Sequence, residues 1–204
     1  MIAIIDYDAG NLRSVQKALQ FIGEEVVITR NHDEIMSAGK VILPGVGAFG
    51  DAMQKLHSYH LIDTIKEVAD CDKPLLGICL GQQLMFEGSE ESDGIEGLGL
   101  LPGKIIRIPE GEGLKIPHVG WNNLNIAQGA SLYQGITGSP YVYFVHSYYL
   151  KSEDRNIVAA TTDYGTLIDA SVEKNNVYAC QFHPEKSGEI GLKILKNFTR
   201  LDER

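Results

Sequence analysis

Short apolar runs alternate with amphipathic segments along residues 2–79, and this alternation restricts the chain to few folds. The runs at 2–6, 25–29, 40–45 and 74–79 have the length and composition of buried strands. The segment between the first two runs carries apolar side chains at helical spacing, namely Leu12, Val15, Leu19 and Ile22. Strands and helices that alternate in this way predict a parallel sheet covered by helices.

The pattern changes after Gly88. Glycines are frequent at 94–103, and strand-like runs follow at 104–109, 141–150, 156–165, 167–174 and 177–183. We expect this later region to be partly antiparallel, and we expect a final amphipathic helix at about 188–201. The whole chain, 1–204, is predicted to be one three-layer α/β domain, with a central mostly parallel sheet flanked by helices and an antiparallel C-terminal portion.

Charge and composition narrow the classes of function. The formal net charge is -9 and no run of Lys or Arg stands out, which argues against nucleic acid or an anionic membrane as the main partner. The opening apolar stretch is too short for a signal peptide, and no apolar run approaches the roughly 20 residues that cross a bilayer. We therefore expect a cytoplasmic protein. Three cysteines are too few and too irregular for a disulfide frame or a zinc site, and we expect no metal and no cofactor.

The sharpest local feature is the pentapeptide Gly77-Ile78-Cys79-Leu80-Gly81, where a buried strand is predicted to end and a helix to begin. A nucleophile at such a turn sits in strained backbone geometry and needs small residues two positions away on either side. The positive end of a helix would favour the thiolate, and the amide of Leu80 would be free to bind an oxyanion. The alternative is that Cys79 is a small buried hydrophobic residue, a common fate of a lone cysteine.

A base for this cysteine is predicted at His183. Glu185 follows two residues later, and in extended geometry both side chains point to the same side, so the carboxylate can orient the ring. A strand-end turn is the other reading of His-Pro-Glu. The three histidines in the first half of the chain are expected at the surface, because none has an acidic residue at a spacing that could orient its ring. These are His32, His57 and His60.

A glycine-rich segment, LPGVGAFG at 43–50, follows the run at 40–45. Glycines at positions 45, 47 and 50 permit a backbone that exposes its amides, which suggests an oxyanion hole. A phosphate-cradling loop or a plain strand-to-helix turn would also explain the glycines, although no P-loop or GxGxxG sequence is present.

Taken together, LPGVGAFGDAM, GICLGQQLMFEGSEE and QFHPEKSG closely resemble the triad, or class I, glutamine amidotransferases. The opening DYDAGNLRSV, the middle PHVGWN and YFVHSYY, and the ending HPEKSGEIGLKILKNF are similar to the glutaminase subunits of imidazole glycerol phosphate synthases. The resemblance implies a class I amidotransferase fold and covalent glutamine hydrolysis by Cys79, His183 and Glu185. It also implies that a peptide at 45–47 flips when the partner is loaded.

The same resemblance implies roles for further residues, each of which could instead be ordinary packing or surface polarity. The oxyanion hole would use Leu80, Val46 and Gly47. Substrate binding would use Gln83, Glu91, His146, Ser147 and Tyr148. His118, Trp121 and Asn122 would face the partner or support the site. Lys186 would contact the partner. The chain departs from the usual family pattern at Asp8, often a glycine, and at Gln82, commonly apolar.

The resemblance further implies a partner: a cyclase subunit with a (β/α)₈ barrel, joined in a heterodimer, which receives ammonia and binds the ribonucleotide. Three alternatives remain open at this point. The acceptor could belong to pyridoxal phosphate, anthranilate or guanylate synthesis. The chain could be a silent subunit that binds a partner without hydrolysing glutamine. A cysteine peptidase or deglycase could carry a similar elbow.

Overall fold

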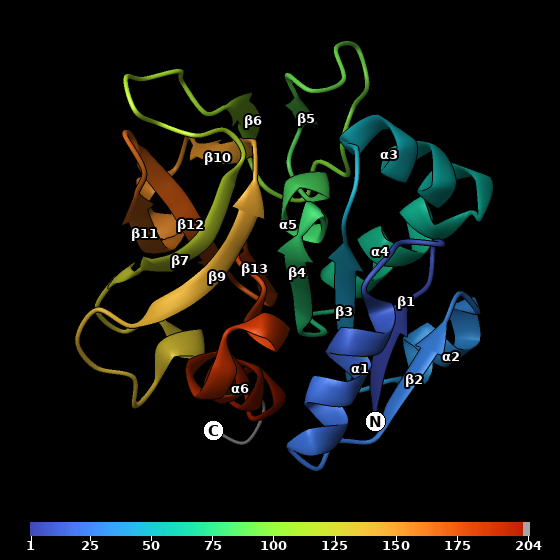
Figure 1. Ribbon diagram of the computed structural model, residues 1–204. Coiled ribbons are helices and arrows are strands. Elements are labelled where there is room, and N and C mark those ends of the chain that lie inside the picture. Colours follow the sequence, from blue (N-terminus) through green and yellow to red (C-terminus); the bar gives the residue numbers. More distant parts are fainter. Residues whose placement is uncertain (202–204) are drawn as a thin grey trace.

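The computed structural model describes residues 1–201 and shows a large mixed sheet with helices on both faces (Figure 1). Within these residues the sheet has eleven strands, and its main path runs β2-β1-β3-β4-β13-β12-β10-β6-β5. A second sheet pairs β7 with β9. The last three residues of the predicted domain, 202–204, lie outside the described residues.

One half of the large sheet is parallel. It contains β2 (Val26–Thr29), β1 (Ile2–Ile5), β3 (Lys40–Gly45), β4 (Leu75–Cys79) and β13 (Val177–Cys180). Strands β1, β3 and β4 are buried along their whole length, as expected for parallel strands covered on both faces. Because β13 pairs with β4 in parallel, the end of β13 lies beside the end of β4.

Helices cover this half on two sides. Buried side chains of α2 to α5 join one core cluster, and those of α1 and α6 join the other, so the predicted three layers are confirmed. Each fully buried Leu, Ile, Val or Phe contributes roughly 1.5–3 kcal/mol. The helices are α1 (Leu12–Phe21), α2 (His32–Ser37), α3 (Phe49–Ser58), α4 (Leu61–Asp70), α5 (Leu80–Leu84) and α6 (Gly188–Thr199).

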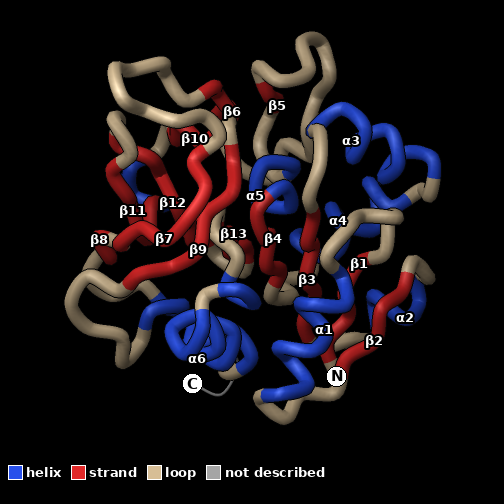
Figure 2. Tube along the Cα trace, in the orientation of Figure 1, coloured by secondary structure: helices blue, strands red, loops and turns tan. Residues whose placement is uncertain are grey.

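The other half is largely antiparallel, as predicted. Figure 2 shows that this half consists mainly of strands and loops. Its elements include three short 3-10 turns. The strands are β5 (Gly88–Ser89), β6 (Gly103–Arg107), β7 (His118–Asn123), β8 (Asn125–Ile126), β9 (Tyr141–His146), β10 (Tyr148–Ser152), β11 (Val158–Asp163) and β12 (Leu167–Lys174). The turns are η1 (Ser131–Tyr133), η2 (Arg155–Ile157) and η3 (Pro184–Lys186).

Two of the predicted runs are divided differently in the structure. The run at 141–150 is two strands, because the chain passes from the small sheet (β9) to the large sheet (β10) at Ser147. The run at 177–183 stops being a strand after Cys180. Both breaks place polar residues at sheet ends. No helix within residues 1–201 is long and apolar enough to cross a membrane.

Candidate active site

The predicted elbow is present at Cys79. This residue ends β4, and its backbone has φ 55° and ψ -108°, a conformation that a side chain adopts only under strain. Helix α5 begins at the next residue. Gly81 is required by packing, since a Cβ there would lie 1.8 Å from the carbonyl oxygen of Leu43. The thiol is 6% exposed.

His183 and Glu185 form the predicted pair beside this elbow. His183 Nδ1 lies 2.7 Å from Glu185 Oε1, and both side chains are fully buried. The expected geometry was wrong, however, because Pro184–Lys186 form a 3-10 turn after β13 and the segment is not extended. The turn closes the distance, and Ser187 Oγ anchors it by donating to the carbonyl oxygen of His183 at 2.6 Å.

The surroundings favour a protonated His183. Burial by itself would lower its pKa, but the nearby Cys79 sulfur and the Glu185 carboxylate raise the pKa from 6.5 to about 9. At neutral pH both ring nitrogens therefore carry a proton: Nδ1 donates to Glu185, and buried Nε2 has no hydrogen-bond partner among the described residues. This arrangement suits a thiolate-imidazolium pair.

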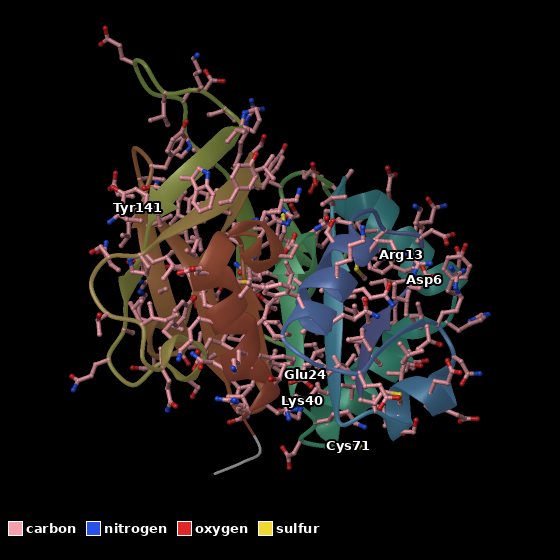
Figure 3. The ribbon with its side chains drawn as sticks, turned by 60° about the horizontal axis from the view of Figure 1, so that its bottom comes forward. Asp6, Arg13, Glu24, Lys40, Cys71 and Tyr141 are labelled. Atoms are coloured by element: carbon pink, nitrogen blue, oxygen red, sulfur yellow. The ribbon has the colours of Figure 1, made fainter. Side chains whose placement is uncertain are left out.

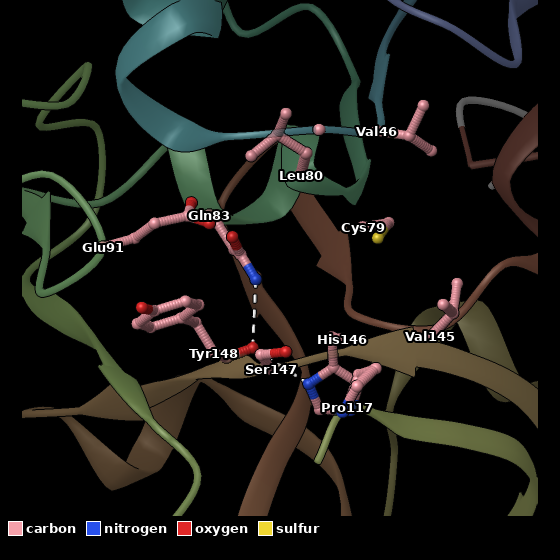
Figure 4. Close-up of a pocket in the computed structure, with 11 residues that line it drawn as sticks. Val46, Cys79, Leu80, Gln83, Glu91, Pro117, Val145, His146, Ser147 and Tyr148 are labelled. Carbon is pink, nitrogen blue, oxygen red and sulfur yellow. Dashed lines mark hydrogen bonds between the residues drawn. The ribbon is translucent and has the colours of Figure 1, made fainter.

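A cavity of about 270 Å³ opens above the cysteine. Its size is below the roughly 300–1,000 Å³ of pockets for drug-sized ligands, so it suits a small molecule. Figure 4 shows Leu80 and Val46 on one side and His146, Ser147 and Tyr148 opposite, with Cys79 between them. The structure thus brings together every residue expected at the oxyanion hole and in substrate binding. The lining residues are Val46, Gly47, Cys79, Leu80, Gln83, Glu91, Pro117, Val145, His146, Ser147 and Tyr148.

Comparison with known proteins decides the family. Residues 3–201 match the family described as Glutamine amidotransferase class-I. The chain is 53% identical over 198 residues to the Imidazole glycerol phosphate synthase subunit HisH of Bacillus cereus (strain G9842), covering 97% of this chain and 93% of the relative. The HisH protein of Methanocaldococcus jannaschii is 49% identical over 201 residues, covering 98% of this chain and 100% of the relative.

The chain belongs to the HisH family of class I glutamine amidotransferases.

Solved structures agree on the fold of this HisH-family chain. A structure described as a glutamine amidotransferase has a TM-score of 0.76 at 20% identity, covering 98% of this chain and 100% of that chain. PurLQS from Thermotoga maritima has a TM-score of 0.74 at 21% identity, covering 98% and 97%. At these identities the likeness concerns the fold alone, and it confirms the predicted fold class.

A residue that sequence reasoning missed, Asn11, touches the pair. Its side-chain amide donates to Glu185 Oε1 at 2.5 Å, from the residue that precedes α1. The adjoining turn contains Asp8 in a left-handed conformation (φ 60°), which explains why glycine is common there. Asp8 is held by Arg30 at 2.6 Å and by the hydroxyl of Tyr59. The only sequence signal for Asn11 was its place in the family-like opening segment.

The wall of the cavity contains a chain of hydrogen bonds whose proton positions follow from the acceptors. The carbonyl of Tyr148 only accepts, so His146 Nδ1, at 2.9 Å, carries a proton. His146 Nε2 must then accept from His118 Nδ1 at 3.0 Å. Asn122 Nδ2 lies 3.5 Å from the remaining nitrogen of His118 and can donate to it. Both histidines are therefore neutral and each has one defined tautomer.

We expect acid to destabilise the HisH-family fold through this histidine pair. Burial lowers the pKa of His118 to about 4 and that of His146 to about 3, against 6.5 for an ordinary histidine. The unfolded chain therefore binds more protons below pH 6.5. The free energy of unfolding should fall by about 2 kcal/mol per histidine between pH 7 and 5, which urea unfolding at several pH values measures.

The matched variants are His118→Gln, which replaces a titrating donor by an amide, and His57→Gln, at an exposed position of α3. The first should flatten the pH dependence and the second should leave it unchanged. Equal slopes for all three proteins would contradict the assignment.

The residues expected at a partner interface lie in different environments. His118 is 2% exposed and stacks between Phe144 and Tyr164, so of its two expected roles, partner contact or support of the site, burial favours support. On the same strand, β7, Trp121 is 55% exposed. Asn122 is half-buried and donates to the carbonyl of Asp163 at 2.8 Å. Lys186 is exposed.

Proposed function

We propose that Cys79 is the nucleophile of this HisH-family glutamine amidotransferase, that His183 transfers protons to and from the reacting groups, and that Glu185 orients His183. The observation that carries the proposal is the buried 2.7 Å contact between His183 and Glu185 beside the strained turn at Cys79. An isolated buried imidazolium would be costly, whereas one flanked by a carboxylate and a thiolate is stabilised.

The reaction follows from these positions. Cys79 Sγ forms a bond to the side-chain carbonyl carbon of glutamine, and the C=O electron pair moves to oxygen. His183 gives its proton to the amide nitrogen, ammonia leaves, and a γ-glutamyl thioester remains. His183 then takes a proton from water, whose oxygen attacks the thioester carbon. The C–S bond breaks, glutamate leaves and the thiolate is restored.

The oxyanion formed in each step needs donors on the cavity side away from His146. We assign this role to the amide of Leu80 and to the backbone of Val46 and Gly47, all of which line the cavity. Gly47 has φ 112°, which a residue with a Cβ rarely adopts, and no atom approaches a Cβ placed there. The position is thus suited to a peptide that turns its amide toward the substrate.

The α-amino end of glutamine has hydrogen-bond acceptors within the same cavity. Gln83 Nε2 donates to the carbonyl of Tyr148 at 3.1 Å and to Gln181 at 3.0 Å, so Gln83 has its oxygen left for a substrate ammonium. Glu91 accepts from the amide of Phe49 with one oxygen at 2.8 Å and keeps the other. We propose that the α-amino group of glutamine binds on the side of Gln83 and Glu91. Ser147 and Tyr148 form the opposite wall of the cavity.

The β7–β9 sheet has the composition of a docking surface. Register places Val119 and Trp121 opposite Val145 and Tyr143, so these side chains share one face with Tyr141. Val119, Trp121 and Tyr141 are 55%, 55% and 60% exposed, and Figure 3 shows Tyr141 at the edge of the antiparallel half. Contiguous exposed aromatic side chains are typical of a protein interface.

The partner we propose is a cyclase subunit with a (β/α)₈ barrel, bound in a heterodimer. HisH relatives are named as subunits of imidazole glycerol phosphate synthase, and this chain supplies that enzyme's glutaminase activity. The cyclase would use the ammonia to make imidazole glycerol phosphate and an aminoimidazole carboxamide ribonucleotide. The exposed face lies near the cavity, since β9 ends at His146.

Glutamate release from glutamine tests the proposal, measured with the chain alone and then with the cyclase and its ribonucleotide. We expect low activity alone and a strong rise with the loaded partner. No activity under any condition would exclude glutamine hydrolysis and favour a silent binding subunit. Stimulation by a different synthase, and none by the cyclase, would assign another acceptor.

Trp121→Ala should weaken partner binding about 30-fold or more, since a large aromatic at the centre of an interface commonly contributes at least 2 kcal/mol. The matched control is Phe21→Ala, which removes a 78% exposed aromatic where α1 ends, toward the amino ends of the parallel strands. Titration calorimetry with the cyclase measures both. Equal affinities for the two variants would place the interface elsewhere.

A further inference from the structure

Gln181 is a fully buried glutamine whose side chain contacts the proposed nucleophile. It follows β13 directly, and its backbone amide donates to the carbonyl of Ala170 at 2.8 Å. Its side-chain Nε2 lies 3.7 Å from Cys79 Sγ, within hydrogen-bonding distance for sulfur. Its Oε1 accepts from Gln83 Nε2 at 3.0 Å.

The orientation of both amides is determined by one carbonyl. Tyr148 can only accept, so the group of Gln83 that faces it at 3.1 Å must be the NH₂. The second hydrogen of that NH₂ points to Gln181, whose facing atom must therefore be oxygen. The NH₂ of Gln181 is then left for Cys79. Turning either amide over would oppose two donors or two acceptors.

We propose that Gln181 is a further catalytic residue, which donates a hydrogen bond to the Cys79 thiolate and is held in that orientation by Gln83. This inference rests on the proposed function, because it takes Cys79 as the nucleophile. A buried anion requires more than one favourable partner. In the proposed mechanism His183 supplies the charged partner, and Gln181 supplies a neutral donor to the sulfur.

The thiolate occurs twice in the reaction, first as the nucleophile and again as the group that leaves when water cleaves the thioester. A donor that stays in place stabilises the sulfur anion at both points without accepting a proton, because an amide does not titrate. Gln83 thereby links the substrate pocket to the nucleophile: its nitrogen positions Gln181 while its oxygen faces the cavity.

The test measures how the rate of Cys79 alkylation by iodoacetamide depends on pH. All proteins carry Cys71→Ser to remove the exposed thiol, while Cys180 is fully buried. Gln181→Met keeps the size of the side chain and removes the donor. In this variant the pH at which the alkylation rate reaches half of its high-pH plateau should rise by about one unit. This is the shift expected when a hydrogen bond to an ion is lost. The kcat for glutamine should fall about tenfold, with less change in KM.

The matched control is Gln82→Met, one residue before Gln83. Gln82 is also fully buried, and its side-chain amide has no hydrogen-bond partner among the residues that the structure describes. Its alkylation profile should coincide with that of the parent protein. A lost core contact alone would affect stability in either variant, whereas only loss of the donor shifts the profile.

An unchanged profile in a folded Gln181→Met variant overturns the proposal. If that variant does not fold, Gln83→Met decides, because freeing Gln181 to rotate should shift the profile in the same direction by a smaller amount, and no shift overturns the proposal. Alkylation requires no glutamine turnover. A shifted profile in a protein that never hydrolyses glutamine would therefore refute the proposed function and leave the contact between Gln181 and Cys79 supported.

Discussion

Replacing Cys79 by alanine should lower glutamate release by about 10⁴-fold or more, because covalent catalysis loses the only atom that bonds to substrate. The fold should be retained, since alanine can end β4 in the same turn and only one buried sulfur atom is lost. Glutamate production with the cyclase present measures the rate. Mass spectrometry of the parent protein during turnover should detect a γ-glutamyl adduct on Cys79.

Cys180→Ala is the matched control. This thiol is fully buried directly opposite Ile78, the residue before Cys79 on β4, and burial raises its pKa well above the ordinary value, so it stays protonated and unreactive at neutral pH. Its sulfur contacts the carbonyl of Phe182 at 3.6 Å. We expect activity within a few fold of the parent. The triad assignment fails if Cys180→Ala is inactive while Cys79→Ala turns over glutamine.

The largest expected effect on stability is that of Gly81→Ala. A Cβ at this position would lie 1.8 Å from the carbonyl oxygen of Leu43, a backbone atom that cannot move without displacing β3 from the sheet. The free energy of unfolding should fall by about 3 kcal/mol or more. Moving α5 would also displace the Leu80 amide, so residual folded protein should be nearly inactive. Urea unfolding and glutamate release measure the two effects.

Gly111→Ala gives the comparison for the same chemical change at an open site. Gly111 is exposed, and the nearest atom to an added Cβ is Leu114 Cβ at 3.8 Å, an ordinary contact. Its unfolding free energy should lie within about 0.5 kcal/mol of the parent protein. A Gly81→Ala protein of equal stability would show that α5 does not pack against β3 as described.

Sequence reasoning located the catalytic segments because each has a local signal. The nucleophile elbow requires small residues at fixed positions, and Gly77 and Gly81 are visible in the sequence as such. The apolar periodicity of 11–22 and 188–201 predicted helices that the structure has at Leu12–Phe21 and Gly188–Thr199. The contact between His183 and Glu185 was predicted correctly from an incorrect local conformation, since a 3-10 turn also brings these residues together.

Asn11 and Gln181 could not be assigned in the same way, because their roles depend on partners far along the chain. Asn11 reaches Glu185 across 174 positions, and Gln181 reaches Cys79 across 102. The family resemblance of PHVGWN implied that His118 faces a partner or supports the site, and strand alternation turns His118 inward, to the side opposite Trp121. The sequence pattern does not indicate which face of β7 packs against the rest of the domain.

The sequence by itself determined the strand-helix alternation, the elbow at Cys79 and the pairing of His183 with Glu185, because these depend on spacing within a few residues. Tertiary structure decided which polar side chains reach the sulfur and the carboxylate. It did so by placing β13 beside β4 and by passing the chain between sheets at Ser147. Side-chain hydrogen bonds act over about 3 Å, so only the packed sheet brings these distant residues close enough to form them.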